Sequence, residues 1–311
     1  MSSELDSTGH QHSHHGHSHA PATFGRAFFI GTVLNLGFVI VEIGYGLASN
    51  SMALLADAGH NFSDVLGLLI AWGAATLSKR EPSANYTYGL RRTSILAALI
   101  NALVLLGATG VIVYEAIVRL WAPQAVLGGT VMAVAAVGIL VNGLTAWLFA
   151  RGRKGDINVR GAFLHMLADA AVAAGVVVSG FLIGRTGWLW LDPATSLVIS
   201  AIILGGTWGL LRQSVEMALD RVPGEISPGS VNAALAALPG VTRVHDLHIW
   251  PMSTTEVALT CHLVMPNGCP GDSFLHDASA MLHERFKIGH STIQVEQDEH
   301  EACALAPHNV V

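Results

Sequence analysis

The chain has 311 residues, of which 51% are hydrophobic and only 12% are charged. Soluble domains carry about 25% charged residues, so this composition excludes an ordinary soluble protein and indicates membrane helices with some soluble mass attached. The formal net charge of −6 leaves no basic surface, and nucleic acid is therefore not an expected partner.

Cysteine usage and the N-terminus set two further limits. The three cysteines form no Cys-x-x-Cys pair and no spaced framework. Disulfides are therefore not expected, and the soluble part is expected to face a reducing compartment. Residues 1–22 are polar and lack the basic region and apolar core of a signal peptide.

The same residues 1–22 form a histidine-rich tail that is expected to be disordered. The sequence GHQHSHHGHSH carries six histidines, namely His10, His12, His14, His15, His17 and His19. Such tracts commonly bind metal loosely, so we interpret this one as a low-affinity collector of zinc. The alternatives are a solvated tail without metal and an expression tag, although tags are usually uninterrupted.

Six apolar stretches follow the tail, each long enough to cross about 30 Å of hydrocarbon as a helix. They lie at 25–48, 52–78, 92–119, 126–150, 158–184 and 189–212. The sequence therefore predicts an α-helical membrane protein with six transmembrane helices within residues 23–213.

Basic residues in the connections between these stretches predict the orientation. The second-to-third and fourth-to-fifth connections and their borders hold Lys79, Arg80, Arg91, Arg92, Arg151, Arg153, Lys154 and Arg160, against Arg119 and Arg185 elsewhere. Because short cytoplasmic loops are enriched in Lys and Arg, both termini are expected in the cytoplasm.

The second and fifth apolar stretches each carry a His-x-x-x-Asp pair. His60 and Asp64 are four residues apart and so share one helix face, and His165 and Asp169 repeat the spacing. Charged groups in the bilayer are costly, so something must offset them. Two imidazoles and two carboxylates are the ligand count of a tetrahedral Zn²⁺ site, and two ionised aspartates balance the divalent charge.

Two alternatives to a metal site remain open at this point. A single His-x-x-x-Asp pair is often a structural hydrogen-bonded pair, and Asp and His chains also serve as proton relays. Asp57 lies seven residues before Asp64 on the same stripe of the helix. Its role is open among a metal ligand, a proton site and a group that orients His60.

Other polar residues of the apolar stretches are weaker signals. Asn35 and Glu42 could line a cavity or pair with another helix. Asn101 and Asn142 are interpreted as hydrogen-bonding links between helices. Glu115 is expected to reach the outer membrane interface.

Residues 214–298 are predicted to form a cytoplasmic α+β domain, followed by a loose tail at 299–311. Helical patterns lie at 227–240 and 273–286, and strand patterns lie at 241–250, 255–265 and 291–297. The order α-β-β-α-β is typical of a small two-layer, ferredoxin-like fold.

The stretches LLADAGHNFSDVLGL, YTYGLRRTSILAALIN and FLHMLADAAVAAG, followed by DLHIW, resemble the cation diffusion facilitator family of zinc transporters. The resemblance covers nearly the whole chain. It implies that His60, Asp64, His165 and Asp169 are the transport-site ligands. It also implies a homodimer, a metallochaperone-like cytoplasmic domain, and export of metal against entering protons. The version with His in the first pair is associated mainly with Zn²⁺.

The resemblance implies two further groups of residues. Arg92 and Asp220 match a charged interlock that ties the membrane domain to the dimer seam, although Arg92 could equally be an interfacial basic residue. His245, His262 and Glu296 best match a cytoplasmic zinc site at the dimer interface, with Asp298 and His276 as further candidates. Where the family pattern has a histidine, this chain has Glu296. Ordinary surface histidines are the alternative for this group, and His248 is interpreted as structural.

We therefore expect a transporter that exports cytosolic Zn²⁺, with Cd²⁺ or Co²⁺ as companions, by proton antiport across a bacterial inner membrane, without an organic cofactor. A membrane-bound metal sensor and an intramembrane metalloenzyme are the alternatives. The sequence has no His-Glu-x-x-His and no glutamate beside either pair, so an enzyme is not expected. A sensor would not need a buried site at mid-span.

Overall fold

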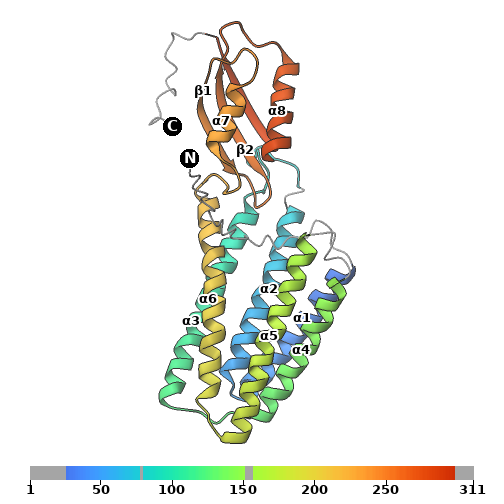
Figure 1. The fold of residues 1–311 in the computed structure, drawn as a ribbon, viewed down its shortest axis with the longest axis vertical. Helices are drawn as coiled ribbons and strands as arrows, with labels where there is room; N and C mark the ends of the chain where they lie inside the picture. Colours follow the sequence, from blue (N-terminus) through green and yellow to red (C-terminus); the bar gives the residue numbers. More distant parts are fainter. Residues whose placement is uncertain (1–25, 78–79, 151–156, 298–311) are drawn as a thin grey trace, which may run out of the picture. The chain divides into compact units, whose positions relative to one another are not determined.

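The computed structural model describes residues 26–77, 80–150 and 157–297. Six long helices come first: α1 (Arg26–Ala48), α2 (Met52–Leu77), α3 (Thr93–Trp121), α4 (Gly128–Ala150), α5 (Ile157–Thr186) and α6 (Leu191–Ala218). They are followed by α7 (Pro228–Ala236), β1 (Arg243–Pro251), β2 (Val257–Val264), α8 (Asp272–Phe286) and β3 (His290–Glu296) (Figure 1).

The long helices coincide with the six apolar stretches to within a few residues at most ends. The main difference is α6, which continues to Ala218 beyond the predicted end near 212. The extension includes Gln213, Ser214 and Glu216, and Arg212 Nε bonds Glu216 Oε1 across one helical turn at 2.9 Å. Such ion pairs stabilise a helix and do not raise its hydropathy. The apolar stretch in the sequence therefore ends before the helix does.

Four helices of the described part of the chain are long and apolar enough to cross a membrane. They are Thr93–Trp121, Gly128–Leu148, Phe163–Thr186 and Leu191–Ala218. A shorter apolar helical segment lies at Thr32–Ala48. The chain therefore has a helical, multi-pass membrane part.

The chain divides into two compact units. The first comprises Met1–Asn61 and Glu115–Ile199, and the second comprises Phe62–Tyr114 and Ser200–Val311. The division falls inside α2, α3 and α6, so each of these helices contributes to both units.

Glycines allow close helix packing in the first unit. A Cβ added to Gly128 of α4 would lie 2.6 Å from the Gly180 carbonyl oxygen of α5. At Gly138 of α4, the added atom would lie 2.8 Å from the Phe38 ring of α1. Small residues let helix backbones approach in this way in membrane proteins. The α5 helix, which carries His165 and Asp169, therefore packs closely on α4.

The start of α2 is held by a carboxylate from α6. Asp192, which is fully buried, accepts hydrogen bonds from Ser51 Oγ at 2.5 Å and from the backbone nitrogen of Met52 at 2.6 Å. The first backbone N–H groups of a helix have no partner within the helix, and a carboxylate there satisfies them. Asp192 therefore caps a helix that is distant from it in sequence.

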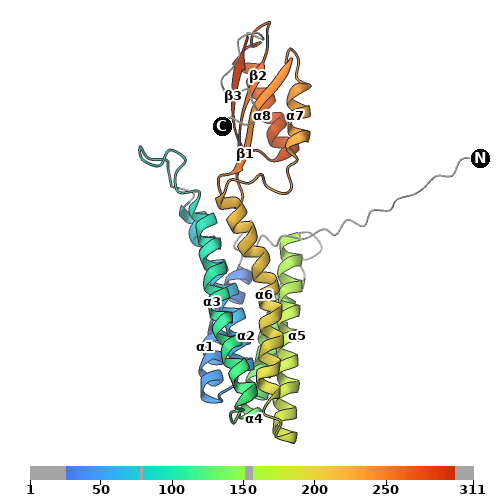
Figure 2. The same cartoon turned by 90° about the vertical axis from the view of Figure 1, so that its left-hand side faces the viewer.

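The C-terminal part of the second unit is a three-stranded sheet in the order β1-β2-β3 with two helices packed on it (Figure 2). Strand β2 pairs with β1 antiparallel and with β3 parallel. The element order α-β-β-α-β is the predicted one. Leu235 of α7, Leu259 and Leu263 of β2 and Leu282 of α8 are fully buried in one core. The alternation along β2 leaves His262 on the face opposite Leu259 and Leu263.

Candidate metal centres

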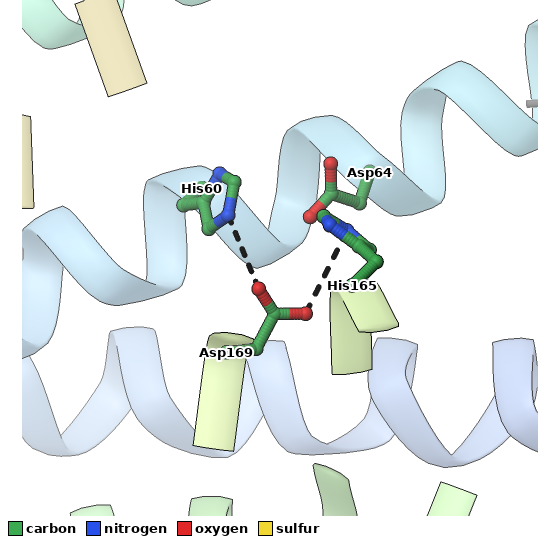
Figure 3. A group of neighbouring side chains, drawn as sticks. All are labelled: His60, Asp64, His165 and Asp169. Atoms are coloured by element: carbon green, nitrogen blue, oxygen red, sulfur yellow. Dashed lines mark ion pairs between the residues drawn. The ribbon is translucent and has the colours of Figure 1, made fainter. Parts of the chain in front are cut away.

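The two His-x-x-x-Asp pairs come together between α2 and α5. His60 and Asp64 lie one turn apart on α2, and His165 and Asp169 lie one turn apart on α5 (Figure 3). One ligand atom from each of the four residues lies within 4.8 Å of the others. We refer to these four residues as the membrane quartet.

Asp169 lies at the centre of the membrane quartet. Its Oδ1 is 3.3 Å from His60 Nε2, and its Oδ2 is 3.6 Å from His165 Nε2. The Asp169 side chain is only 2% exposed, whereas the two histidines are 22% and 28% exposed. The two imidazoles meet edge to face, with ring centroids 5.8 Å apart.

The spacing of these atoms suits a small divalent cation. With Zn–N and Zn–O bonds of about 2.0–2.1 Å, neighbouring ligands of a tetrahedral site lie about 3.3–3.4 Å apart. The His60–Asp169 distance equals that spacing, and the His165–Asp169 distance is slightly longer. A bound divalent ion would also neutralise the two carboxylates, which are otherwise costly to bury.

Asp57 is not part of this ligand group. Its side chain is buried, and it interacts with the buried Glu42 of α1. Glu42 also accepts a hydrogen bond of 3.3 Å from Asn61 Nδ2, directly after His60. Asn35 of α1 contacts Met166 Sδ, directly after His165, at 3.6 Å. Polar groups of α1 therefore contact the immediate sequence neighbours of both histidines.

A second group of potential ligands lies on the sheet. His245 of β1, His262 of β2 and Glu296 of β3 have ligand atoms within 4.8 Å of one another. His245 and His262 are directly opposite each other in the antiparallel pair. Glu296 Oε1 is 2.9 Å from His262 Nδ1, and Glu296 Oε2 is 3.3 Å from His245 Nε2. We refer to these three residues as the sheet triad.

The electrostatics of the sheet triad favour a neutral imidazole at His245. Burial lowers the pKa of His245 below its ordinary value, and the neighbouring His262 and Arg243 act in the same direction. The Glu296 and Asp246 carboxylates oppose this shift. A neutral imidazole is the form that binds a metal.

Asp246 also lies beside the sheet triad, which the sequence did not predict. Strand alternation would direct Asp246 to the face opposite His245. The register instead shifts between His245 and His248, and Asp246 has a φ of 50°. Its carboxylate consequently lies 2.8 Å from His248 Nε2 and 3.4 Å from His262 Nε2. Asp246 thus holds the ring of one triad histidine.

Among the remaining candidates for metal binding, His276 falls within the described residues. His276 lies exposed on α8 and does not belong to the triad. Asp298 lies outside the described residues. The same holds for the tail histidines His10, His12, His14, His15, His17 and His19.

Arg92 and Asp220 form an ion pair within the second unit. Arg92 Nη2 is 2.5 Å from Asp220 Oδ1, and both side chains are about half exposed. The preceding Arg91 pairs with Glu256 in the β1–β2 turn at 2.7 Å. Ser94 Oγ accepts a hydrogen bond from the Thr254 backbone nitrogen at 3.2 Å. The start of α3 is therefore attached both to the end of α6 and to the sheet domain.

Two family models match this chain. The cation efflux transmembrane domain matches residues 28–217. The cation efflux protein cytoplasmic domain matches residues 223–298. Together they cover nearly all of the described residues.

Three curated proteins illustrate the similarity to known transporters. The metal cation efflux system protein CzcD of Cupriavidus metallidurans is 35% identical over 295 residues, covering 94% of this chain and 93% of that protein. The cadmium, cobalt and zinc/H(+)-K(+) antiporter of Bacillus velezensis is 33% identical, covering 92% and 93%. The zinc transporter ZitB of Escherichia coli is 36% identical, covering 92% of each. The chain belongs to the cation efflux, or cation diffusion facilitator, family of divalent metal transporters.

Proposed function

We propose that this efflux transporter exports cytosolic Zn²⁺ through the membrane quartet in exchange for protons. The observation that carries the proposal is the convergence of two imidazoles and two carboxylates from α2 and α5 within 4.8 Å. Similar proteins are named for zinc, cadmium and cobalt, so Cd²⁺ and Co²⁺ are proposed as further substrates. All three of the similar proteins are named for transport, and none for sensing or catalysis.

The donor set of the membrane quartet supports a choice among metals. Imidazole nitrogen suits Zn²⁺ and Co²⁺, whereas Mg²⁺ and Ca²⁺ prefer shells made entirely of oxygen. The two carboxylates offset the charge of one divalent ion. We therefore propose one divalent ion per membrane quartet, bound by all four residues.

Proton exchange follows from the ionisation of the ligands. A metal binds only deprotonated imidazole and carboxylate, so protons and metal compete for the same four side chains. An unperturbed imidazole titrates near pH 6.5, within the physiological range. When the membrane quartet faces the cytosol it binds metal and releases protons. When it faces outward, entering protons displace the metal, and the protonated transporter returns.

The membrane arrangement is proposed to have six spans, α1 to α6. The helix α2 carries Asp57, His60 and Asp64 within an otherwise apolar sequence. An even number of spans leaves both termini on one side, and the basic connections favour the cytoplasm. The similar proteins named above come from bacteria, which supports location in a bacterial inner membrane. The transmembrane part is proposed within residues 23–213 and the cytoplasmic part within 214–298.

The cytoplasmic domain is proposed to be ferredoxin-like, to resemble metallochaperones and to bind a divalent metal at the sheet triad. His245, His262 and Glu296 offer two nitrogens and one carboxylate at short mutual distances. This donor set fits Zn²⁺, with a fourth position left for another ligand. We propose that the domain forms a homodimer, and that the Arg92–Asp220 pair ties α3 and α6 to that assembly. The N-terminal histidines are proposed to collect zinc loosely.

The test is metal flux in proteoliposomes that contain a zinc-sensitive dye and a pH-sensitive dye. The full chain should move Zn²⁺ and move protons in the opposite direction. Asp64→Ala and Asp169→Ala should abolish both signals. Asp272→Ala, an exposed aspartate in the first turn of α8, is the matched control and should transport normally. Unchanged zinc flux in both quartet variants would contradict the proposal.

A further inference from the structure

The two ring nitrogens of His262 in the sheet triad face two different carboxylates. Glu296 Oε1 is 2.9 Å from His262 Nδ1, and Asp246 Oδ2 is 3.4 Å from His262 Nε2. Glu296 is a member of the triad, whereas Asp246 is not part of that ligand group. Only one nitrogen of the ring can be the ligand when a single metal ion is bound, so the two carboxylates have different roles.

The position of Glu296 indicates that the ligand nitrogen of His262 is Nδ1. The same carboxylate also faces His245, with Glu296 Oε2 3.3 Å from His245 Nε2. His245 is 9% exposed, and neither of its ring nitrogens forms a hydrogen bond with the described residues. Buried polar atoms in this state are typical of sites that an ion or a water molecule completes. A cation bound among these three residues would meet Nδ1 of His262, while Nε2 faces Asp246.

An irregularity in β1 places Asp246 on this face of the sheet. The register of β1 shifts between His245 and His248. Asp246 and Leu247 consequently stand opposite the single residue Cys261 of β2. Such β-bulges redirect a side chain, and Asp246 has a φ of 50°, which costs free energy in residues other than glycine. The backbone thus adopts a costly conformation that brings the carboxylate to the face of the triad.

The Asp246 carboxylate is buried between two imidazoles. The side chains of Asp246 and His262 are 11% and 10% exposed. Asp246 Oδ1 is 2.8 Å from His248 Nε2, while Oδ2 faces His262. Burying a carboxylate is costly unless hydrogen bonds or opposite charges accompany it. The contacts with both rings offset this cost and fix the direction of the carboxylate.

We propose that Asp246 is a positioning residue of the sheet triad, which accepts the Nε2 hydrogen of His262 and so directs Nδ1 of that ring to the metal. The proposal rests on the proposed metal site at the triad and adds a residue that does not touch the metal. A carboxylate on the second nitrogen of a ligand imidazole fixes its tautomer and orientation, and it raises the basicity of the ligand nitrogen. The 3.4 Å contact is long for an N–H···O bond, and the charge of the carboxylate strengthens it.

The zinc affinity of the full chain tests this role. Every protein in the comparison carries Asp64→Ala and Asp169→Ala, which remove the membrane quartet, and a competing chelator masks loose binding elsewhere on the chain. Asp246→Gly removes the carboxylate and leaves a residue that adopts a positive φ freely. We expect its zinc affinity to fall about 10–100-fold, the usual effect of losing such a supporting carboxylate. Asp246→Asn keeps an acceptor oxygen and should lose less affinity than Asp246→Gly.

Lys287→Gly is the matched control for the backbone. Lys287 has a φ of 59° at the C-terminal end of α8 and is not a member of the triad. The variant therefore makes the same backbone change elsewhere in the domain, and its zinc affinity should be unchanged. The melting temperature of each variant in the presence of a chelator separates a loss of ligand orientation from a loss of folding.

Nitrogen-15 NMR of the histidine-labelled, zinc-loaded protein supplies an independent readout that needs no substitution at residue 246. A nitrogen that binds zinc and a nitrogen that carries hydrogen differ in chemical shift, and His262→Ala identifies the signals of this ring. We expect Nδ1 of His262 to bind zinc and Nε2 to carry the hydrogen.

Two results would overturn the proposal. One is zinc bound to Nε2 of His262, and the other is an Asp246→Gly protein with unchanged zinc affinity. Failure of the proposed metal site is distinguishable from both, because His262→Ala would then bind zinc as tightly as the protein with His262.

Discussion

Asp169 on α5 lies 3.3 Å from His60 on α2, and its second oxygen faces the other histidine of the membrane quartet. One almost fully buried carboxylate thus contacts both imidazoles. Asp169→Asn keeps the shape of the side chain but removes its charge. We expect the affinity for Zn²⁺ to fall at least about 30-fold, which corresponds to the loss of about 2 kcal/mol from a charged contact.

Isothermal titration of the detergent-solubilised protein measures this loss. Zinc binding at the sheet triad would add to the measured heat. The comparison of Zn²⁺ affinities therefore uses the His262→Ala protein with and without Asp169→Asn. Asp277→Asn on the exposed face of α8 serves as the control. Equal affinities in the presence and absence of Asp169→Asn would exclude this carboxylate as a ligand.

The identity of residue 60 is expected to set the choice of metal. His60→Asp would leave one imidazole and three carboxylates, and oxygen-rich sites suit Mn²⁺ better than sites rich in nitrogen. We expect the variant to move Mn²⁺ at a rate that the wild-type protein does not reach, while Zn²⁺ flux persists. Vesicle flux with each metal at equal concentration measures the ratio. A Mn²⁺-to-Zn²⁺ ratio equal to that of the wild type would show that residue 60 does not select the metal.

The membrane quartet was predictable because its signal is local. A spacing of four residues places His60 with Asp64, and His165 with Asp169, on one helix face whatever the rest of the fold does. That both pairs form one transport site was implied only by the resemblance to the family. The strands around His245 and His262 were likewise readable from alternation over a few residues.

Contacts between distant segments were not predictable in the same way. Asp192 caps α2 from the start of α6, and nothing in the sequence near Asp192 refers to Ser51 or Met52. The interaction of Glu42 with Asp57 depends on how α1 lies against α2. Asp246 reaches His262 only because a bulge and a positive φ break the alternation. Each of these needs a tertiary arrangement that no short pattern encodes.

The Asp192 cap gives a prediction about the stability of α2. Asp192→Ala would leave the buried Met52 N–H and Ser51 hydroxyl without this partner, at a cost of about 1–3 kcal/mol each. We expect a lower apparent Tm in detergent and weaker zinc binding, because α2 carries half of the membrane quartet. Thr195→Ala, one turn further along α6, removes a single hydrogen bond to Ser179 and serves as the control. Equal melting of the Asp192 variant and the wild type would show that the cap contributes nothing.

Two cysteines of the cytoplasmic domain should differ sharply in reactivity. Burial, with a smaller effect from Asp246, raises the pKa of the Cys261 thiol to about 12. Cys269 is only partly buried. At pH 8 we expect N-ethylmaleimide to modify Cys261 about a thousandfold more slowly than Cys269, because only the thiolate reacts. Peptide mass spectrometry measures both rates in one sample, and denaturation should abolish the difference. Comparable rates in the native protein would place Cys261 at the surface.

The sheet triad should make the cytoplasmic domain sensitive to acid when no metal is bound. The pKa of His245 is lower in the folded protein than its ordinary value of about 6.5. The unfolded chain therefore binds more protons than the folded domain between these two pKa values, so stability rises with pH in that window. The stabilisation is complete above about pH 6.5 and is lost as the pH falls through the lower, folded pKa.

Hydrogen exchange of the β2 amides in the full, chelator-treated protein measures this dependence at pH 5.5 and pH 7.5. After correction for the intrinsic exchange rate, protection should be lower at pH 5.5, and His245→Gln should weaken the difference. His283→Gln, in the last turn of α8 and outside the triad, is the control. Added Zn²⁺ should increase the protection more at pH 7.5 than at pH 5.5, since protons compete with metal for the imidazoles. If His245→Gln and the wild type lost protection equally on acidification, His245 could not be the group responsible.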